Sequence, residues 1–131
     1  MNISLNITAF YASLLALLLL TLSFNVIRLR LKHKIGIGDG EQKSLAAAIR
    51  VHGNFIEYIP LALILLGAYE FNGADNLWVH ILGGALFTGR IFHAIGLSKT
   101  IGVSVQRQLG IVITFLVLLI LSIENIRLFI F

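Results

Sequence analysis

A run of polar side chains interrupts an otherwise apolar stretch of the sequence between residues 50 and 60. Arg50, Asn54 and Glu57 follow i, i+4 and i+7 spacing, so a helix with 3.6 residues per turn brings them to one face, with Tyr58 on its flank. Two charged groups and an amide on one face can bind a polar, charged ligand through charge-assisted hydrogen bonds. Ionisable side chains are costly in an apolar environment, so this run is a candidate functional site.

Three further apolar segments carry residues of the same types. Arg90 and His93 are three residues apart and share a helical face, Gln106 and Arg107 open the last apolar segment, and Arg28 lies near the end of the first. The chain therefore has a candidate polar cluster contributed by four separate segments.

The composition indicates which elements position these residues. Of the 131 residues, 58% are hydrophobic and 12% are charged, and the mean hydropathy is +0.95, whereas a soluble domain carries about 25% charged residues. A helix that crosses a bilayer needs about 20 mostly apolar residues. We predict one all-α integral membrane domain over residues 1–131, a bundle of four transmembrane helices at about 5–31, 45–71, 77–97 and 105–129. The first apolar segment is too long for a cleavable signal peptide and no basic residue precedes it, so we expect it to be retained.

The basic residues predict the orientation of these helices. The first connection is rich in Lys and Arg, the third carries Lys99, and the second connection and the N-terminal tail have neither residue type. The positive-inside rule then makes connections one and three cytoplasmic and puts both termini on the opposite side. Because neighbouring helices run antiparallel, the candidate polar residues all fall at the cytoplasmic level, whereas the outer half of the bundle shows little comparable polarity. A basic pocket with one carboxylate, open to the cytoplasm, suits an anionic polar ligand.

The same residues also have plainer interpretations. Arg50 and Glu57 could form a structural salt bridge that holds the bundle together, and His93 could be a hydrogen-bonded packing residue. His52 points away from the Arg50 face, and His80 falls at the outer end of its helix. The four histidines do not share a face at ligand spacing, so we predict no metal site. The formal charge of +4 does not indicate a nucleic-acid partner, because the basic residues sit at the ends of apolar runs.

The motifs together resemble a known family. The run Arg50-x-x-x-Asn54-x-x-Glu57-Tyr58-x-Pro60 is similar to the second-helix signature of the MAPEG family, the membrane-associated proteins of eicosanoid and glutathione metabolism. The similarity continues in the segments Ile27–Arg30, Gly89–His93 and Arg107–Gly110, so it covers nearly the whole chain in order. The turn Gly38–Gly40 and the run Arg50–Asn54 look most like the small bacterial branch of the family.

The resemblance implies a homotrimer of four-helix bundles in a bacterial inner membrane, with glutathione bound as co-substrate between subunits near the cytoplasmic face. The positions that match glutathione-contacting residues of the family are Arg28, Arg50, Asn54, Glu57, Tyr58, Arg90 and His93. Arg107 matches the arginine that stabilises the glutathione thiolate, where a cation lowers the thiol pKa and enlarges the nucleophilic fraction. Glu57 would hold the ammonium group of the tripeptide, and Arg50 and Arg90 its carboxylates.

Two functions from different classes follow. The main prediction is a membrane-bound glutathione-dependent transferase or peroxidase acting on a lipophilic electrophile that enters from the lipid. The alternative is a non-catalytic membrane protein of the same family that binds lipid or a small molecule, because Leu97 stands where several glutathione-using members have tyrosine. A small channel or exporter subunit is a weaker third interpretation, since no polar path continues toward the outer side. The sequence leaves the identity of the hydrophobic substrate open, because its groove would be lined by interchangeable aliphatic residues.

Overall fold

The fold consists of four long helices in a computed structural model that describes residues 4–99 and 104–131, without the side chains of 97–99. The helices are α1 (Asn6–His33), α2 (Lys43–Phe71), α3 (Asn76–Lys99) and α4 (Val105–Ile130). The all-helical class is as expected, and every helix boundary lies within two residues of the expected one. The side chains of Leu97 and Lys99, used above, lie outside the described part.

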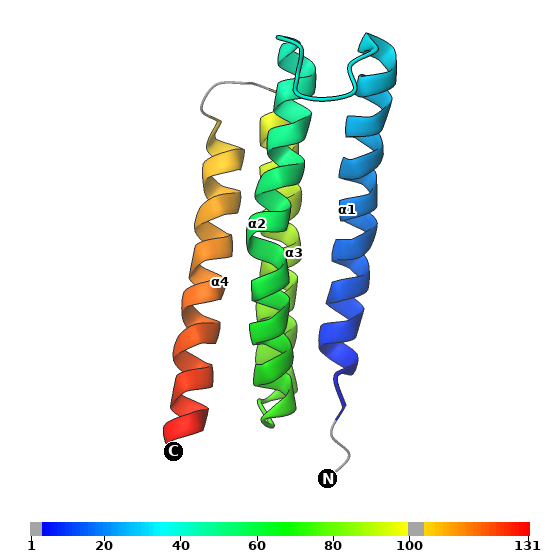
Figure 1. Cartoon of the computed structure of the whole chain (residues 1–131). Helices are drawn as coiled ribbons and strands as arrows, with labels where there is room; N and C mark the ends of the chain where they lie inside the picture. The colour runs from blue at the N-terminus through cyan, green and yellow to red at the C-terminus, as the bar shows by residue number, and fades with distance from the viewer. Residues whose placement is uncertain (1–3, 100–103) are drawn as a thin grey trace.

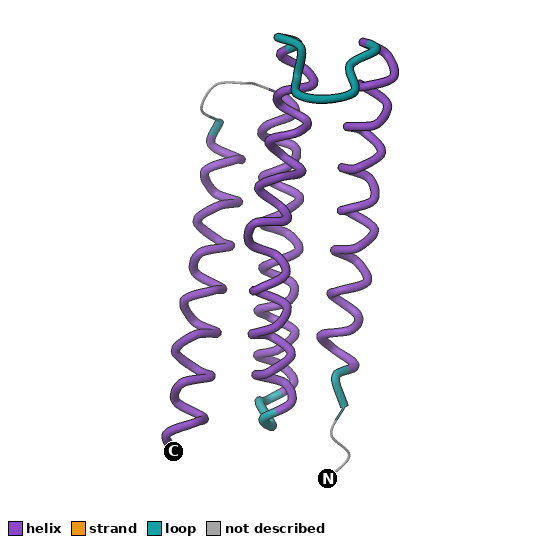
Figure 2. The backbone as a smooth tube through the Cα atoms, viewed as in Figure 1, coloured by secondary structure: helices purple, strands orange, loops and turns teal. Residues whose placement is uncertain are grey.

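The helices run alternately up and down and lie side by side (Figure 1). α2 and α3 occupy the middle of the bundle and both contact α1 and α4, whereas α1 and α4 do not touch each other over the described residues. Figure 2 shows the α1–α2 connection crossing one end of the bundle, with the start of α1 and the end of α4 near the other end. We call the end that carries this connection, residues 34–42, the loop end.

The core of the bundle forms around one apolar stripe of α2. Phe55, Ile59, Ala62, Leu66 and Tyr69 alternate in steps of four and three residues, which keeps all five on one helical face, and all are buried. The side chains that pack against this stripe come from every other helix: Leu15, Leu82, Leu86, Val117 and Leu121. The core therefore fixes how α2 is rotated relative to its neighbours, and with it the direction of its polar side chains.

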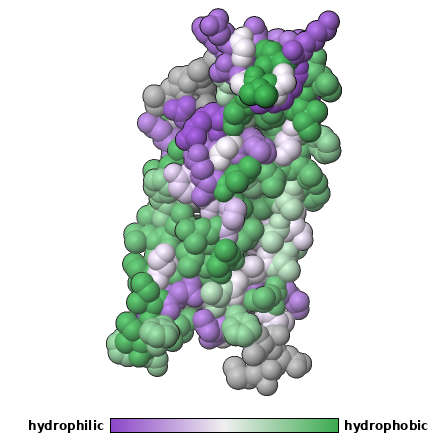
Figure 3. All heavy atoms as spheres, in the orientation of Figure 1, coloured by the Kyte–Doolittle hydropathy of each residue, from purple (hydrophilic) through white to green (hydrophobic). Residues whose placement is uncertain are grey.

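The outer surface of the bundle is largely apolar. Many large hydrophobic side chains are exposed, as suits a surface that faces lipid. Figure 3 shows hydrophilic residues gathered at the loop end and on the surface next to it, above a mostly hydrophobic remainder. By length and composition α1, α2 and α4 can each cross a membrane. These three are the helices that meet the criterion among the described residues; α3 has 24 residues, and the side chains at its end lie outside the described part.

The α1–α2 connection is held in shape by a side chain of α1. The Arg30 guanidinium donates hydrogen bonds to the carbonyl oxygens of Ile35, Gly36 and Gly38, at 3.4, 3.2 and 2.9 Å. Gly38 has a φ of +70°, a backbone conformation that glycine adopts without steric cost. The connection is thus an ordered segment lying beside the start of α2.

The expectation of little polarity in the other half of the bundle was wrong. Glu70 on α2 is buried, and its two carboxylate oxygens accept hydrogen bonds from the backbone nitrogens of Ile7 and Thr8, at 3.0 and 2.7 Å. The first turn of α1 has unpaired N–H groups that need acceptors, and no side chain of α1 caps it. Glu70 supplies that cap from another helix. The side chain of Asn125 is also bonded in this half, donating to the carbonyl oxygen of Leu65.

Candidate functional site

The centre of the predicted cluster is a buried arginine. The core packing turns Arg90 of α3 toward α2, where its side chain is only 1% exposed. Its Nη2 donates a hydrogen bond of 2.8 Å to Oδ1 of Asn54 and lies 3.5 Å from Nδ1 of His93, which is also buried. The guanidinium carbon stands 5.6 Å from the centre of the Phe55 ring, within the range of a cation–π contact. Two helices thus hold one cation by an amide, an imidazole and an aromatic face.

The hydrogen-bonding capacity of Arg90 is only partly used. Its Nε and Nη1 atoms are buried, and no acceptor among the described residues is in reach of either. No carboxylate pairs with Arg90 within the part of the chain that the structure covers. A buried charge without a counter-charge is costly, by several kcal/mol in real proteins. Such a group favours an anion that brings its own acceptors.

Arg50 and Glu57 form an ion pair beside this buried centre. Nη1 of Arg50 lies 2.9 Å from Oε1 of Glu57, and both side chains are about half exposed on the bundle surface. The two residues are two helical turns apart, so the long arginine side chain lies along α2 to reach the carboxylate. Asn54, between them in sequence, turns inward to Arg90. The helical face predicted from the spacing therefore borders the buried centre. Arg50 and Glu57 of this face lie on the surface, whereas Asn54 lies inside.

Close packing of α3 and α4 brings Arg107 to the same region. A Cβ added at Gly110 would meet the carbonyl oxygen of Gly89 and lie 2.7 Å from the backbone nitrogen of His93, so only glycine permits this approach. Ser104 caps α4 by accepting a 3.3 Å hydrogen bond from the Arg107 backbone nitrogen. A Cβ added at Gly96 of α3 would lie 2.6 Å from the backbone nitrogen of Arg107, so the start of α4 packs against the part of α3 that carries His93.

Two predicted residues lie apart from this centre. Tyr58 packs edge-on against the Phe115 ring of α4, with ring centres 5.3 Å apart, on the flank of the Arg50 face. Arg28 is exposed on α1 and donates a 2.9 Å hydrogen bond to Asn25 of its own helix. Within one subunit the described structure gives Arg28 no contact with the residues around Arg90. Over the described residues, Arg28 therefore stays outside the candidate site of its own subunit.

Two of the histidines outside the cluster have structural partners. His52 lies 3.0 Å from the hydroxyl of Ser23 on α1, consistent with its pointing away from the Arg50 face. His80 lies 3.2 Å from the Tyr11 hydroxyl, far from the loop end. Nowhere in residues 4–99 and 104–131 do three histidine or acidic side chains come together as metal ligands.

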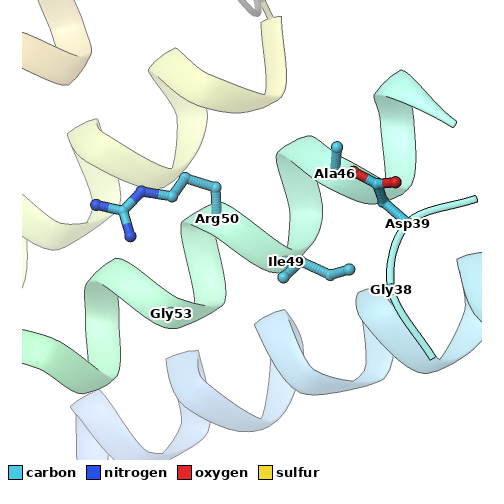
Figure 4. Close-up of a pocket in the computed structure, with 6 residues that line it drawn as sticks. All are labelled: Gly38, Asp39, Ala46, Ile49, Arg50 and Gly53. Atoms are coloured by element: carbon cyan, nitrogen blue, oxygen red, sulfur yellow. The ribbon is translucent and has the colours of Figure 1, made fainter. Parts of the chain in front are cut away.

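A cavity adjoins the cluster at the loop end. It has a volume of about 370 Å³ and its lining residues are Gly38, Asp39, Ala46, Ile49, Arg50 and Gly53. Figure 4 shows Ile49 pointing toward the loop that carries Asp39, whereas the Arg50 side chain points away from that loop. The cavity wall is therefore mostly apolar, with one carboxylate at its rim and the stem of Arg50 along its side.

Sequence reasoning missed Phe55 and Asp39 as parts of this region. Phe55 follows Asn54 directly and is typical of an apolar core residue, so its contact with Arg90 becomes visible only with the rotation of α3. Asp39 was interpreted as a turn residue. The pair of flanking glycines was the available signal, since it indicates a loop that must adopt a defined shape.

The comparisons with known proteins agree with the motifs. The model of the MAPEG family matches residues 8–127. The chain is 41% identical over 119 residues to the inner membrane protein YecN of Escherichia coli K12, which covers 91% of this chain and 89% of that protein. The protein of the same name from Escherichia coli O6:H1 matches to the same extent. This chain, with its buried arginine between two helices and its second-helix signature, belongs to the MAPEG family.

Proposed function

We propose that this protein is a membrane-bound glutathione-dependent transferase or peroxidase that acts on a lipophilic electrophile. The observation that carries the proposal is Arg90, a buried cation with two N–H-bearing atoms, Nε and Nη1, that lack acceptors among the described residues. Glutathione has two carboxylates, one ammonium group and one thiol. Arg90 and Arg50 fit its carboxylates, and Glu57 fits its ammonium group, through charge-assisted hydrogen bonds.

In this proposal Arg107 acts on the sulfur atom. A guanidinium beside the glutathione thiol lowers the thiol pKa, so a larger fraction is thiolate at neutral pH. The thiolate attacks the electrophilic carbon of the second substrate, a carbon–sulfur bond forms, and the leaving group departs with the bonding electrons. The apolar outer surface of the helices gives a lipophilic substrate access from the membrane.

The proposal includes the assembly and its setting. Three copies surround the sites, so that the exposed Arg28 and the half-exposed Arg50 and Glu57 of neighbouring copies face protein and ligand instead of lipid, where charges are costly. All four helices cross a bacterial inner membrane, like that of the relative, with α3 shielded by its neighbours. The loop end and Arg107 face the cytoplasm, because the basic residues concentrate there, and glutathione enters from that side.

The test is calorimetric titration of glutathione into the detergent-purified protein. Arg50→Ala removes one half of an exposed ion pair in the proposed site, and Arg127→Ala removes one half of the Arg127–Glu124 pair near the other end of the bundle. The expected result is binding to wild type and to Arg127→Ala, with at least tenfold weaker binding to Arg50→Ala, about 1.4 kcal/mol. Binding that is absent from wild type, or equal in both variants, contradicts the proposal.

A second candidate function is ligand binding without catalysis. The observation in its favour is the mostly apolar wall of the loop-end cavity, in which Asp39 and Arg50 are the charged lining residues. A generic aryl chloride separates the two functions. Formation of its glutathione conjugate by wild type, and loss of that activity in Arg107→Ala with glutathione binding retained, supports the transferase and rejects binding alone.

A further inference from the structure

The guanidinium of Arg90 is held in two different ways by successive residues of α2. Asn54 accepts a 2.8 Å hydrogen bond from Nη2, whereas the guanidinium carbon lies over the Phe55 ring, 5.6 Å from its centre. A hydrogen bond occupies one of the N–H groups that point outward from the flat guanidinium. An aromatic ring attracts the positive charge through its quadrupole and occupies none of them. Phe55 therefore stabilises the cation and leaves its donors available.

The available donors lie inside the protein. Nε and Nη1 of Arg90 are buried and have no acceptor among the described residues, while Nη2 lies near both Asn54 and His93. A carboxylate in the place of the Phe55 ring would pair with the cation and occupy the N–H groups that an anionic ligand needs. An aromatic ring at this position thus suits a site whose counter-ion comes from outside the protein.

The core fixes the Phe55 ring, and the ring in turn limits where the charge of Arg90 can lie. Phe55 is 3% exposed and belongs to the apolar stripe of α2, one turn before Ile59. An arginine side chain has many rotamers, and without the ring the guanidinium could turn about its hydrogen bond to Asn54 and leave this orientation. The apparent dissociation constant of a ligand rises as the fraction of protein in the binding orientation falls.

We propose that Phe55 is a positioning residue for glutathione, because its ring holds Arg90 as an oriented cation whose free N–H groups bind a carboxylate of the tripeptide. This role rests on the proposed function and belongs to the same site. Phe55 acts through Arg90 and touches neither the thiol nor the second substrate. A residue that only fills the core would act through its size and shape, whereas the positioning role depends on the electron density of the ring.

The experiment replaces Phe55 by mono-, di- and trifluorinated phenylalanine in the detergent-purified protein and titrates each variant with glutathione by calorimetry. Fluorine withdraws electron density from the ring and weakens its attraction for a cation, while the shape of the side chain changes little. We expect the dissociation constant of glutathione to rise with each added fluorine atom, up to about fivefold. Phe55→Leu, which stays apolar but has no ring, should bind glutathione at least as weakly as the trifluorinated variant.

Phe87 is the matched control. It lies three residues before Arg90 on α3, is partly buried against the same core, and forms no cation–π contact over the described residues. The same three fluorinated replacements at Phe87 should leave the dissociation constant at the wild-type value.

The possible results separate this role from the proposed function. If glutathione binds every fluorinated Phe55 variant as tightly as wild type, or if the rise is equal at Phe87, the positioning role is overturned and the proposed function stands. Weak binding to Phe55→Leu alone, without a trend across the fluorinated series, would mean that Phe55 serves only to fill the core, and this too would overturn the role. Absence of binding to wild type would contradict the proposed function itself, and the role of Phe55 with it.

Discussion

Glu70 on α2 caps the first turn of α1 by accepting a 2.7 Å hydrogen bond from the backbone nitrogen of Thr8 and a second one from Ile7. The two partners are 62 residues apart in sequence. The carboxylate also complements the partial positive charge of a helix N-terminus. Over the described residues α1 packs against α2 and α3 but not against α4, so this cap, together with the Ser23–His52 and Tyr11–His80 contacts, helps to hold α1 in the bundle.

The cap predicts a stability effect away from the site. Glu70→Ala should lower the free energy of unfolding by about 1–2 kcal/mol, the usual cost of losing a helix cap. Thermal unfolding in detergent measures it, and glutathione binding should be unchanged. Glu124→Ala, which removes a partly exposed carboxylate from its ion pair with the exposed Arg127, should cost at most about 1 kcal/mol. Equal effects in the two variants would contradict a capping role for Glu70.

The hydrogen bond between the buried Arg90 and Asn54 predicts an unusual pair of results. Asn54→Leu leaves the buried guanidinium without its hydrogen bond to Oδ1 and should destabilise the protein by roughly 1–3 kcal/mol. The double variant Asn54→Leu/Arg90→Met replaces the whole polar pair by apolar groups and should recover that loss or exceed wild type. Both variants should bind no glutathione. An Asn54→Leu variant that is as stable as wild type would mean that Arg90 does not depend on its hydrogen bond to Asn54.

The contact between α3 and α4 predicts strict intolerance of a methyl group at residue 110. Gly110→Ala forces a Cβ against the Gly89 carbonyl and the His93 nitrogen, both backbone atoms, and should cost about 1–3 kcal/mol. Gly53→Ala is the control, since a Cβ there meets nothing within 4 Å and alanine favours a helix. Its unfolding temperature should equal or exceed that of wild type. A drop as large as that of Gly110→Ala would contradict the steric explanation.

The role of Arg30 predicts a local change in dynamics. Arg30→Gln removes the guanidinium that bonds three carbonyls of the α1–α2 connection, so the backbone of residues 35–40 should exchange its amide hydrogens faster. Hydrogen exchange followed by peptide mass analysis measures this. Lys32→Gln removes a nearby charge that bonds none of these carbonyls, and exchange in the same peptide should stay at the wild-type rate. Equal exchange in Arg30→Gln and wild type would be the contrary result.

Some of these features could be predicted from the sequence and others could not, for identifiable reasons. The long apolar segments predicted the helices, and the spacing of Arg50, Asn54 and Glu57 predicted a shared face, because both depend only on periodicity along one chain segment. The contact of Arg90 with Asn54 and Phe55 depends on how α3 is rotated against α2, which the whole core decides.

Glu70 is a second feature that could not be predicted from the sequence. A single acidic residue near the end of an apolar helix is typical of a residue at the membrane surface. The sequence around Glu70 does not indicate that Thr8 is its hydrogen-bond partner. The cap arises because the antiparallel arrangement brings the end of α2 beside the start of α1. The family motifs predicted that the chain belongs to the MAPEG family. The role of each matched residue is a question for the experiments above.

The two arginines of α2 and α3 also differ in when their hydrogen-bond partners become available during synthesis. Arg50 finds Glu57 within its own helix, so α2 can enter the membrane with its charges already matched. Arg90 finds its amide acceptor on α2, a helix made earlier, and no carboxylate among the described residues pairs with it. The Arg90 side chain can therefore reach this acceptor only after α3 has packed against α2, so the contact between Asn54 and Arg90 forms during assembly of the helices and not within one of them.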